Sequence, residues 1–396
     1  MITYYSFKSL EIIIIIIFLN IYKMSANKPK DLFLLEGISY LVFNKDFTQC
    51  ALSKKDYDIY IYQVPNIMDT NTWKLLYTLK NHFQYISGLD WNPVTNKILS
   101  CSYDKTSFVW KFEGDKWGFE NVVANTKVSF LFCSWNKRGD KFLEGTGNKS
   151  LFVGYFSSDP NTNWWTGRPI KVHKKTSIIC AKFDPSSLYV ISGATDLKVH
   201  VTSCYMKGVD DDHISPEQAK SLPEFGESLY SFDAGAWVIS CGWTLDGKYG
   251  IASSQKGQIA IIDWQEKKEE IINCNHSPVT FIVPVSATSF YAVGFDREIY
   301  LYEQKEGKWA LAKVITKKEK KEDSKSSGPI NTGATGGGVA EALKKFSSQG
   351  MKKKQSLVIT TEKNENGHSS CISSITIKGD DIITTDLSGF VKYWKK

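Results

Sequence analysis

Residues 82–110 read HFQYISGLDWNPVTNKILSCSYDKTSFVW, and this stretch is the most complete copy of a unit to which most of the chain aligns. Three short segments, YISGLDW, KILSCS and TSFVW, alternate apolar with small or polar residues, as half-buried strands do. The turn sequences NPVTN and YDK separate them. The stretch therefore predicts an antiparallel unit of three short strands.

Polar and aromatic residues of this stretch fit one hydrogen-bonded network. Asp104 falls in the predicted tight turn, where it can accept from the backbone and from His82 in the preceding loop. Ser100 or Ser102, together with Trp110, would extend the network inward. This order of His, Ser, Asp and Trp is the signature of a propeller blade of the WD-repeat type. Because a buried polar network is costly to leave half satisfied, these residue types are expected to occur together.

The unit recurs seven times. Its last predicted strand ends near Tyr62, Trp110, Gly154, Thr202, Ile262, Tyr302 and Trp394. Its first strand ends at Phe43, Trp91, Trp135, Phe183, Trp243, Val283 and Ile377. Both series keep a spacing of 40 to 60 residues except before the last unit, and a propeller blade takes roughly 40 to 45. The sequence therefore predicts an all-β fold over residues 24–396: a seven-bladed WD-repeat β-propeller with a long insertion between the sixth and last blades.

The network residues recur less regularly than the strands. Asp precedes the strand end by six positions at Asp56, Asp104, Asp196 and Asp296, while Asn148, Lys256 and Ser388 replace it in the other units. We therefore expect the complete network in one or two blades. Four histidines lie in the loop before a first strand: His82, His173, His276 and His368. They are expected to be structural and solvent-adjacent rather than metal ligands.

Composition and motifs together predict a folded protein with reduced cysteines and no enzymatic activity. The 396 residues are 42% hydrophobic and 13% aromatic, and the eight cysteines stand singly without a CxxC pair. That pattern favours buried thiols in the cytoplasm over a zinc or disulfide framework.

No GxSxG, HExxH or GxxxxGK[ST] motif is present, and GATGGGV at 333–339 lacks the Lys and Ser/Thr of a phosphate loop. No catalytic residue, cofactor or metal is predicted. Nucleic acid is disfavoured because the lysine runs carry only one aromatic residue, Phe346.

The N-terminal residues 1–23 are interpreted as a non-structural extension, with Met24 as the start of the folded part. The apolar run EIIIIIIFLN at 11–20 is too short for a membrane-spanning helix. A signal peptide fits its length, but no small-residue cleavage site follows. Stable membrane insertion is therefore not expected.

Two gaps exceed the blade spacing. The first, between Thr202 and Trp243, is polar and predicts a surface loop with one helical turn at SPEQAKSL. The second gives a basic insertion, residues 313–370, that we expect to be mobile. Its residues 313–354 hold eleven lysines and four acidic residues, so 11 − 4 = +7, which equals the net charge of the whole chain.

Within the insertion, Val339, Ala342, Leu343 and Phe346 follow a helical i, i+3, i+4, i+7 spacing, which predicts a short amphipathic helix near 339–346. Such a helix is too short to be stable alone and needs a partner surface. Two interpretations are open. The insertion is either a solvated basic loop or an arm that charge steers to an acidic partner and that docks through its apolar stripe.

The middle of the chain is similar to a known family. The segments GTGNKSLFVGYF, NTNWWTGRPIKVHKKTSIICAKFDP and LPEFGESLYSFDAGAWVISCGWTLDGKYGIAS resemble the WD-repeat subunit, subunit 1, of the actin-related protein 2/3 complex. The paired Trp164 and Trp165, the FGE of 225–227 and the GAW of 235–237 are the most specific marks. The resemblance extends from about Met24 to Trp394 and includes the long insertion.

This resemblance implies a non-enzymatic subunit of an assembly that nucleates branched actin filaments. The implied partners are the other subunits, including the actin-related proteins, the actin filament and nucleation-promoting factors. It also implies that the insertion projects a short helix toward actin or activators. That helix maps to Val339, Leu343 and Phe346, with Lys344 and Lys345. The alternative is another propeller adaptor, such as a ubiquitin-ligase substrate receptor or a platform on anionic membranes.

Overall fold

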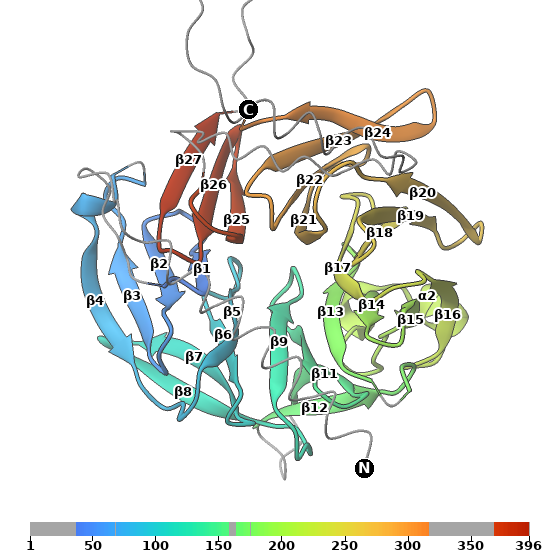
Figure 1. The fold of residues 1–396 in the computed structure, drawn as a ribbon. Coiled ribbons are helices and arrows are strands. Elements are labelled where there is room, and N and C mark those ends of the chain that lie inside the picture. Colours follow the sequence, from blue (N-terminus) through green and yellow to red (C-terminus); the bar gives the residue numbers. More distant parts are fainter. Residues whose placement is uncertain (1–36, 68, 158–163, 175, 317–367, 396) are drawn as a thin grey trace, which may run out of the picture. The chain divides into compact units, whose positions relative to one another are not determined.

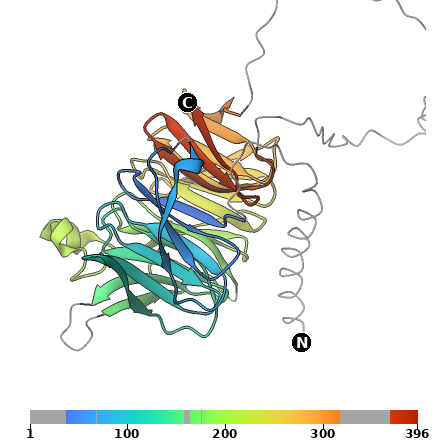
Figure 2. The ribbon, with the colours of Figure 1, turned by 90° about the vertical axis from the view of Figure 1, so that its left-hand side faces the viewer.

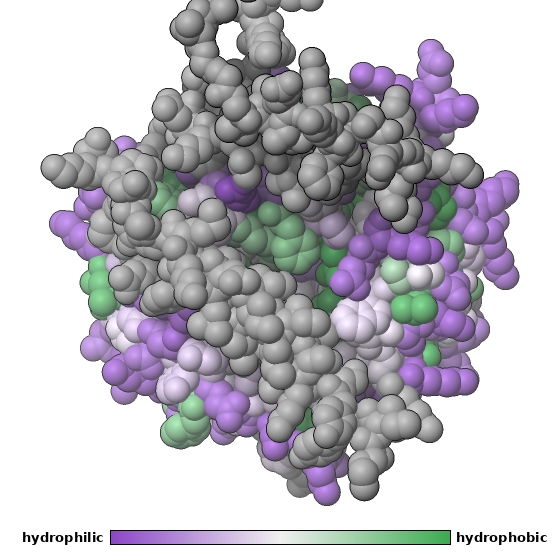
Figure 3. All heavy atoms as spheres, viewed as in Figure 1, coloured by the Kyte–Doolittle hydropathy of each residue, from purple (hydrophilic) through white to green (hydrophobic). Residues whose placement is uncertain are grey.

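Seven antiparallel units of three or four strands, the blades, follow one another along the chain and lie in a ring (Figure 1). The structure, a computed structural model, describes residues 37–67, 69–157, 164–174, 176–316 and 368–395. Residues 317–367 lie outside this range. Hydrophilic residues occupy much of the visible periphery of the ring (Figure 3). The predicted seven-bladed WD-repeat β-propeller is confirmed.

The first four blades take up residues 40–233. Blade 1 holds β1 (Tyr40–Phe43), β2 (Gln49–Ser53), β3 (Ile59–Gln63) and β4 (Lys74–Leu79), with a 3-10 turn, η1 (Thr70–Thr72), before β4. Blade 2 holds β5 (Ile86–Trp91), β6 (Ile98–Ser102), β7 (Ser107–Glu113) and β8 (Lys116–Val123). Blade 3 holds β9 (Phe130–Trp135), β10 (Lys141–Thr146), β11 (Leu151–Ser157) and β12 (Trp164–Ile170). Blade 4 holds β13 (Ile178–Phe183), β14 (Tyr189–Ala194), β15 (Lys198–Ser203) and β16 (Ser228–Asp233).

The last three blades complete the ring. Blade 5 holds β17 (Val238–Trp243), β18 (Tyr249–Ser254), β19 (Gln258–Asp263) and β20 (Lys268–Asn273). Blade 6 holds β21 (Val279–Ser286), β22 (Ser289–Gly294), β23 (Ile299–Lys305) and β24 (Lys308–Val314). Blade 7 holds β25 (Ile372–Lys378), β26 (Asp381–Asp386) and β27 (Val391–Lys395). Lys313, at the start of the predicted insertion, lies near the end of β24 and pairs with Leu301 of β23.

Six blades have four strands, so the predicted unit of three strands is wrong. The strand that the sequence placed last is the third of each blade, and an outer strand follows it. In β4, KLLYTL, only Leu79 is buried. Because an outer strand presents much of its surface to solvent, it lacks the regular apolar alternation that marks the three inner strands.

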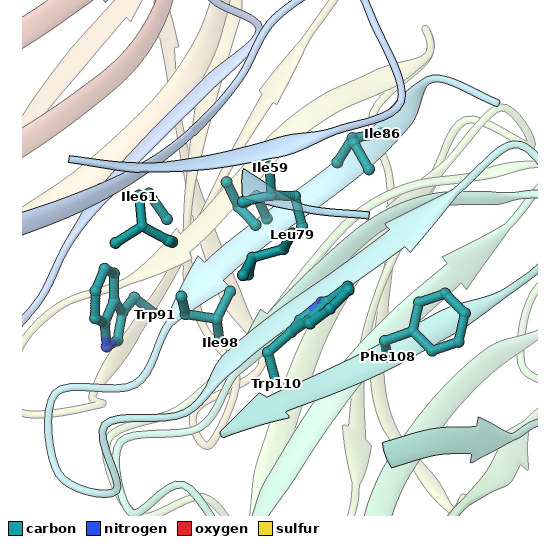
Figure 4. Packing of buried hydrophobic residues seen from close by; sticks show 10 residues of the cluster. Ile59, Ile61, Leu79, Ile86, Trp91, Ile98, Phe108 and Trp110 are labelled. Atoms are coloured by element: carbon teal, nitrogen blue, oxygen red, sulfur yellow. The ribbon is translucent and has the colours of Figure 1, made fainter. Parts of the chain in front are cut away.

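Blades pack face to face through apolar side chains. Ile59 and Ile61 of β3 are fully buried, and with Ile98 and Trp110 of blade 2 they belong to one cluster (Figure 4). Burying an aliphatic side chain of this size contributes about 1.5–3 kcal/mol. The alternating apolar residues of each inner strand therefore hold its blade against the neighbouring blades.

Blades 2 and 3 share one eight-stranded sheet, because β12 pairs in parallel with β8. The two tryptophans at the start of β12 differ in burial at this junction. Trp165 is 1% exposed and donates from Nε1 to Glu120 Oε2 at 2.8 Å, whereas Trp164 is 42% exposed. One of the two residues that mark the family resemblance therefore ties two blades together.

A long loop, residues 204–227, connects β15 to β16. It contains a 3-10 turn, η2 (Asp211–His213), and a helix, α2 (Pro216–Ser221), in the place where the sequence predicted a helical turn. Ser215 caps the helix by accepting from the backbone N of Gln218, and the Gln218 side chain accepts from the Ser215 N in return. The helix stands away from the blades and buries none of its residues (Figure 2).

Candidate functional site

The structure brings together His82, Ser100, Asp104 and Trp110 of blade 2. His82 Nδ1 lies 3.2 Å from Asp104 Oδ2, and His82 Nε2 lies 2.8 Å from Ser100 Oγ. Trp110 Nε1 donates to Ser100 Oγ at 2.8 Å. A neutral imidazole satisfies every member, because the Ser100 hydroxyl then donates to Nε2 while Nδ1–H donates to the carboxylate. Ser102, the alternative to Ser100, instead donates to the Gln84 carbonyl.

Asp104 also fixes the loop that contains His82. Its Oδ2 accepts from the Phe83 backbone N at 2.8 Å, and its Oδ1 accepts from the Thr106 N at 2.8 Å. Burial alone would raise the pKa of Asp104, but hydrogen bonds from His82, Thr106 and the backbone outweigh burial and hold that pKa well below its usual range. The carboxylate is therefore charged and connects the loop, the turn and the inner strand.

We expect the substitution Asp104→Ala to lower the free energy of unfolding by roughly 1 to 3 kcal/mol, because His82 and the Phe83 N lose their acceptor. Lys256 occupies the Asp position of blade 5 and is exposed, so Lys256→Ala is the matched control and should cost much less. Urea denaturation of both variants measures the difference. Equal destabilisation would mean that the network does not hold the blade.

Blade 7 contains a second complete network, which the sequence did not locate. His368 Nδ1 lies 3.1 Å from Asp386 Oδ2, His368 Nε2 lies 2.5 Å from Thr384 Oγ1, and Trp394 Nε1 donates to Thr384 Oγ1 at 2.7 Å. The carboxylate comes from the last residue of β26 rather than from the turn, two positions before Ser388. The fixed spacing of blade 2 therefore points to Ser388 in this blade, although Asp386 is the residue that binds the histidine.

Blade 4 has three of the four members. His173 Nδ1 lies 2.9 Å from Asp196 Oδ2, and its Nε2 lies 3.0 Å from Ser192 Oγ. Thr202 stands where Trp110 stands in blade 2, and its hydroxyl has no hydrogen-bond partner. The expectation that the loop histidines are solvent-adjacent is wrong for His82, His173 and His368, which the networks hold below 7% exposure.

His173, Asp196 and His200 are the one group in the described part of the chain whose ligand atoms lie within 4.8 Å of one another in a pattern that could hold a metal ion. Burial, followed by the neighbouring His173, lowers the pKa of His200 to about 4, so its ring is neutral. However, both ring nitrogens of His173 already have partners in the blade network. We therefore assign this group to the structure of blade 4.

In blade 6, Ala292 stands at the position of the network serine and Tyr302 at that of the tryptophan. His276 Nε2 lies 2.6 Å from the Tyr302 hydroxyl, and the His276 ring stacks on Tyr300 at 3.9 Å between centroids. Asp296 accepts from the Tyr300 hydroxyl at 2.6 Å and from the Ser277 N at 3.1 Å. Asp296 therefore still fixes the loop, although the structure does not place it against His276.

Blade 3 carries a buried carboxyl at the position of the network serine. Glu144 of β10 is fully buried, and its Oε1 accepts from the Ser107 hydroxyl of blade 2. Its Oε2 has no hydrogen-bond partner. Burial raises the pKa of Glu144 to about 8, so the carboxyl is mostly protonated at neutral pH.

A buried ion cluster, not recognised from the sequence, anchors the 204–227 loop to blade 3. Lys141 of β10 is fully buried, and its Nζ donates to Asp210 Oδ2 at 2.8 Å and to the Ser187 carbonyl at 2.7 Å. Arg138 pairs with the other oxygen of Asp210. Met206 of the loop packs in the core shared by blades 3 and 4. Lys141 occupies a buried strand position where an apolar residue is usual. Its burial is explained by its hydrogen-bond partners in the loop, which the sequence alone does not reveal.

The predicted contact residues Val339, Leu343, Lys344, Lys345 and Phe346 lie outside the described residues, as do residues 1–23. Within the described ranges, no helix combines the length and the apolar character needed to cross a membrane.

The seven blades, together with the complete His–Ser/Thr–Asp–Trp networks of blades 2 and 7, define a WD-repeat β-propeller. In agreement, residues 73–111 match the family described as "WD domain, G-beta repeat". That range covers the outer strand of blade 1 and the three inner strands of blade 2, where the network is complete.

Comparison with known proteins identifies similar proteins that belong to one particular complex. The chain is 28% identical over 268 residues to actin-related protein 2/3 complex subunit 1A-B of Xenopus laevis, covering 67% of this chain and 70% of the relative. It is 25% identical over 345 residues to subunit 1A of Arabidopsis thaliana, covering 86% and 87%, and 23% identical over 275 residues to subunit 1 of Schizosaccharomyces pombe, covering 68% and 71%. The resemblance to the WD-repeat subunit of this complex is confirmed.

Proposed function

We propose that the chain is a non-enzymatic propeller subunit of an actin-related protein 2/3 complex and supports nucleation of branched actin filaments in the cytoplasm. The observation that carries the proposal is the similarity to subunit 1 proteins of an animal, a plant and a yeast over at least two thirds of the chain. The pairs of His82 with Asp104, His173 with Asp196 and His368 with Asp386 fit this role, because each of them is engaged in the structure of its own blade.

Affinity purification of the full chain from its own cells, followed by identification of the co-purifying proteins, tests the proposal directly. We expect the two actin-related proteins and the other subunits in equal amounts. Recovery of ubiquitin-ligase components without these subunits would contradict the proposal and favour a substrate receptor.

We further propose that the insertion is a docking arm for actin or a nucleation-promoting factor. Its support is the apolar spacing of Val339, Leu343 and Phe346 beside Lys344 and Lys345. A short amphipathic helix of this kind gains stability only on a partner surface, and its lysines favour an acidic one.

Changing both Leu343 and Phe346 to Ser should weaken binding to the partner by roughly one to three orders of magnitude, mainly through faster dissociation. Full burial of one such side chain is worth about 1.5 to 3 kcal/mol, so partial burial of the two in the bound state accounts for a loss of this size. A filament-branching assay with purified complex, together with binding kinetics, measures the effect. Normal branching by this variant would leave the insertion as a solvated loop.

Neutralising Lys352, Lys353 and Lys354 provides the matched comparison. This variant should bind more slowly at low salt, and the defect should fade at high salt because salt screens the attraction. Neither variant should leave the complex, since neither alters the propeller. Loss of assembly would show that the insertion belongs to the assembly surface instead.

A further inference from the structure

One face of the ring is built from the loops that precede the first strands and from the turns between second and third strands. We call it the histidine face, because His82, His173, His276 and His368 lie in its loops. Hydrogen bonds join neighbouring blades along it. Ser129 donates to the Tyr103 carbonyl at 2.7 Å, and Arg297 donates to the Ser369 carbonyl at 3.4 Å.

Five successive blades place an exposed cation at the same turn of this face. The cations of blades 2 to 6 lie at or next to the turn between the second and third strands: Lys105, Lys149, Lys198, Lys256 and Arg297. The turns on the opposite face do not repeat one sign of charge. They contain, for example, Asp184 and Asp246 as well as Lys137.

Three of these cations occupy a backbone conformation that normally favours glycine. Lys105, Lys149 and Arg297 have φ angles of 72°, 46° and 67°. Glycine reaches this region without a steric cost, and it fills the corresponding turn position at Gly257 and Gly389. Leu197 of blade 4 has the same conformation, with φ 68°, so the repetition of the charge on this face, and not the backbone conformation, points to a role for it.

Three aspartates of the same turns face inward. Asp104 and Asp196 bind the histidines of their blades, and Asp296 binds the Tyr300 hydroxyl and the Ser277 N. These three aspartates are therefore engaged in the blades, while the cations of the same turns are exposed. Glu298, beside Arg297, accepts from the Thr316 hydroxyl.

Large aromatic side chains lie on the same face. Phe83 and Tyr85, in the loop before β5, are 78% and 51% exposed, and Phe295 in the turn after β22 is 50% exposed. Tyr57 of blade 1 lies with its ring 5.6 Å from that of Tyr85. The hydrogen bond from the Phe83 N to Asp104 fixes the loop that presents the first two.

We propose that the histidine face binds an anionic membrane surface, with the five cations against phospholipid headgroups and Phe83 and its aromatic neighbours in the interfacial layer. Cations at equivalent turns of five blades match a planar array of charges better than a linear peptide, which would contact two or three turns. Interfacial aromatic residues and basic clusters are the usual components of peripheral membrane contacts. The inference goes beyond the proposed function and does not depend on it.

Sedimentation of the full chain with phosphatidylcholine vesicles, with and without phosphatidylserine, tests the proposal. We expect binding only when phosphatidylserine is present, weakening as salt rises. Changing Lys105, Lys149 and Lys256 to Gln should weaken binding by about a hundredfold, because each lysine near an anionic surface contributes about fivefold. Phe83→Ser should remove the binding that persists at high salt.

The matched control neutralises Lys137, Lys248 and Lys267, which are also exposed and lie in turns of the opposite face. Lys267 also shares the left-handed backbone conformation, with φ 54°. This variant should bind vesicles normally, and both triple variants should keep the thermal midpoint of the parent. The proposal is overturned by equal loss in both variants or by no loss in either. Binding of polyglutamate but not of vesicles would also overturn it, because the face would then serve an acidic protein. Co-purification of the complex subunits is measured separately, so a failure here leaves the proposed function untouched.

Discussion

Asp210→Ala should lower the free energy of unfolding by about 3 to 5 kcal/mol, one of the two largest effects that we expect in this protein. The substitution leaves the Lys141 ammonium fully buried with only carbonyl partners, and removing one member of a buried ion pair carries a cost of this size. Urea denaturation gives the free energy. Trypsin adds a local readout, because Lys207 and Lys220 lie in the loop that Asp210 anchors.

The double variant Asp210→Ala, Lys141→Met separates charge burial from loop packing. It removes both charges, so its loss of stability should be clearly smaller than that of Asp210→Ala alone. Arg138 remains near the surface, with its side chain 21% exposed, and water can solvate it. A double variant that is as unstable as the sum of the two single variants would show that the pair is not coupled.

The sequence predicted the inner framework of the fold because that framework follows a strict alternation. The predicted ends of the first strands at Phe43, Trp91 and Trp135 coincide with the ends of β1, β5 and β9. The outer strands were missed, since they are half exposed and carry no such alternation. In β20, for example, both glutamates of KEEIIN line up with isoleucines of β19, and the strand is recognised only by that pairing.

The polar networks could be predicted only where their residues stand at regular spacings in the sequence. In blade 2 the four residues stand at fixed spacings along two adjacent hairpins, so a sequence pattern can locate them. In blade 7, Asp386 reaches His368 from the end of a strand, and only the three-dimensional arrangement shows that the two positions are equivalent. Lys141 and Asp210 are far apart in the sequence, and no local pattern relates them.

Glu144→Gln should stabilise the protein at neutral pH by about 3 kcal/mol and should have little effect near pH 4. The pKa of Glu144 is about 8 in the folded protein and ordinarily 4.5. Between these values the folded chain holds a proton that the unfolded chain releases, so stability falls by about 1.4 kcal/mol for each pH unit. Below the ordinary pKa both states are protonated, and above pH 8 the loss is complete.

Glutamine keeps the acceptor for the Ser107 hydroxyl and does not titrate, so it removes only this pH-dependent loss. Glu120 is the matched control. It is partly exposed, and hydrogen bonds from Lys111 and Trp165 outweigh its burial and lower its pKa. Glu120→Gln should therefore destabilise the protein slightly at neutral pH, and this difference should vanish as the pH falls through that lowered pKa. Chemical denaturation of both variants from pH 4 to 9 measures the two curves. A constant gap between Glu144→Gln and the parent over this range would show that the Glu144 carboxyl does not carry its proton in the folded protein.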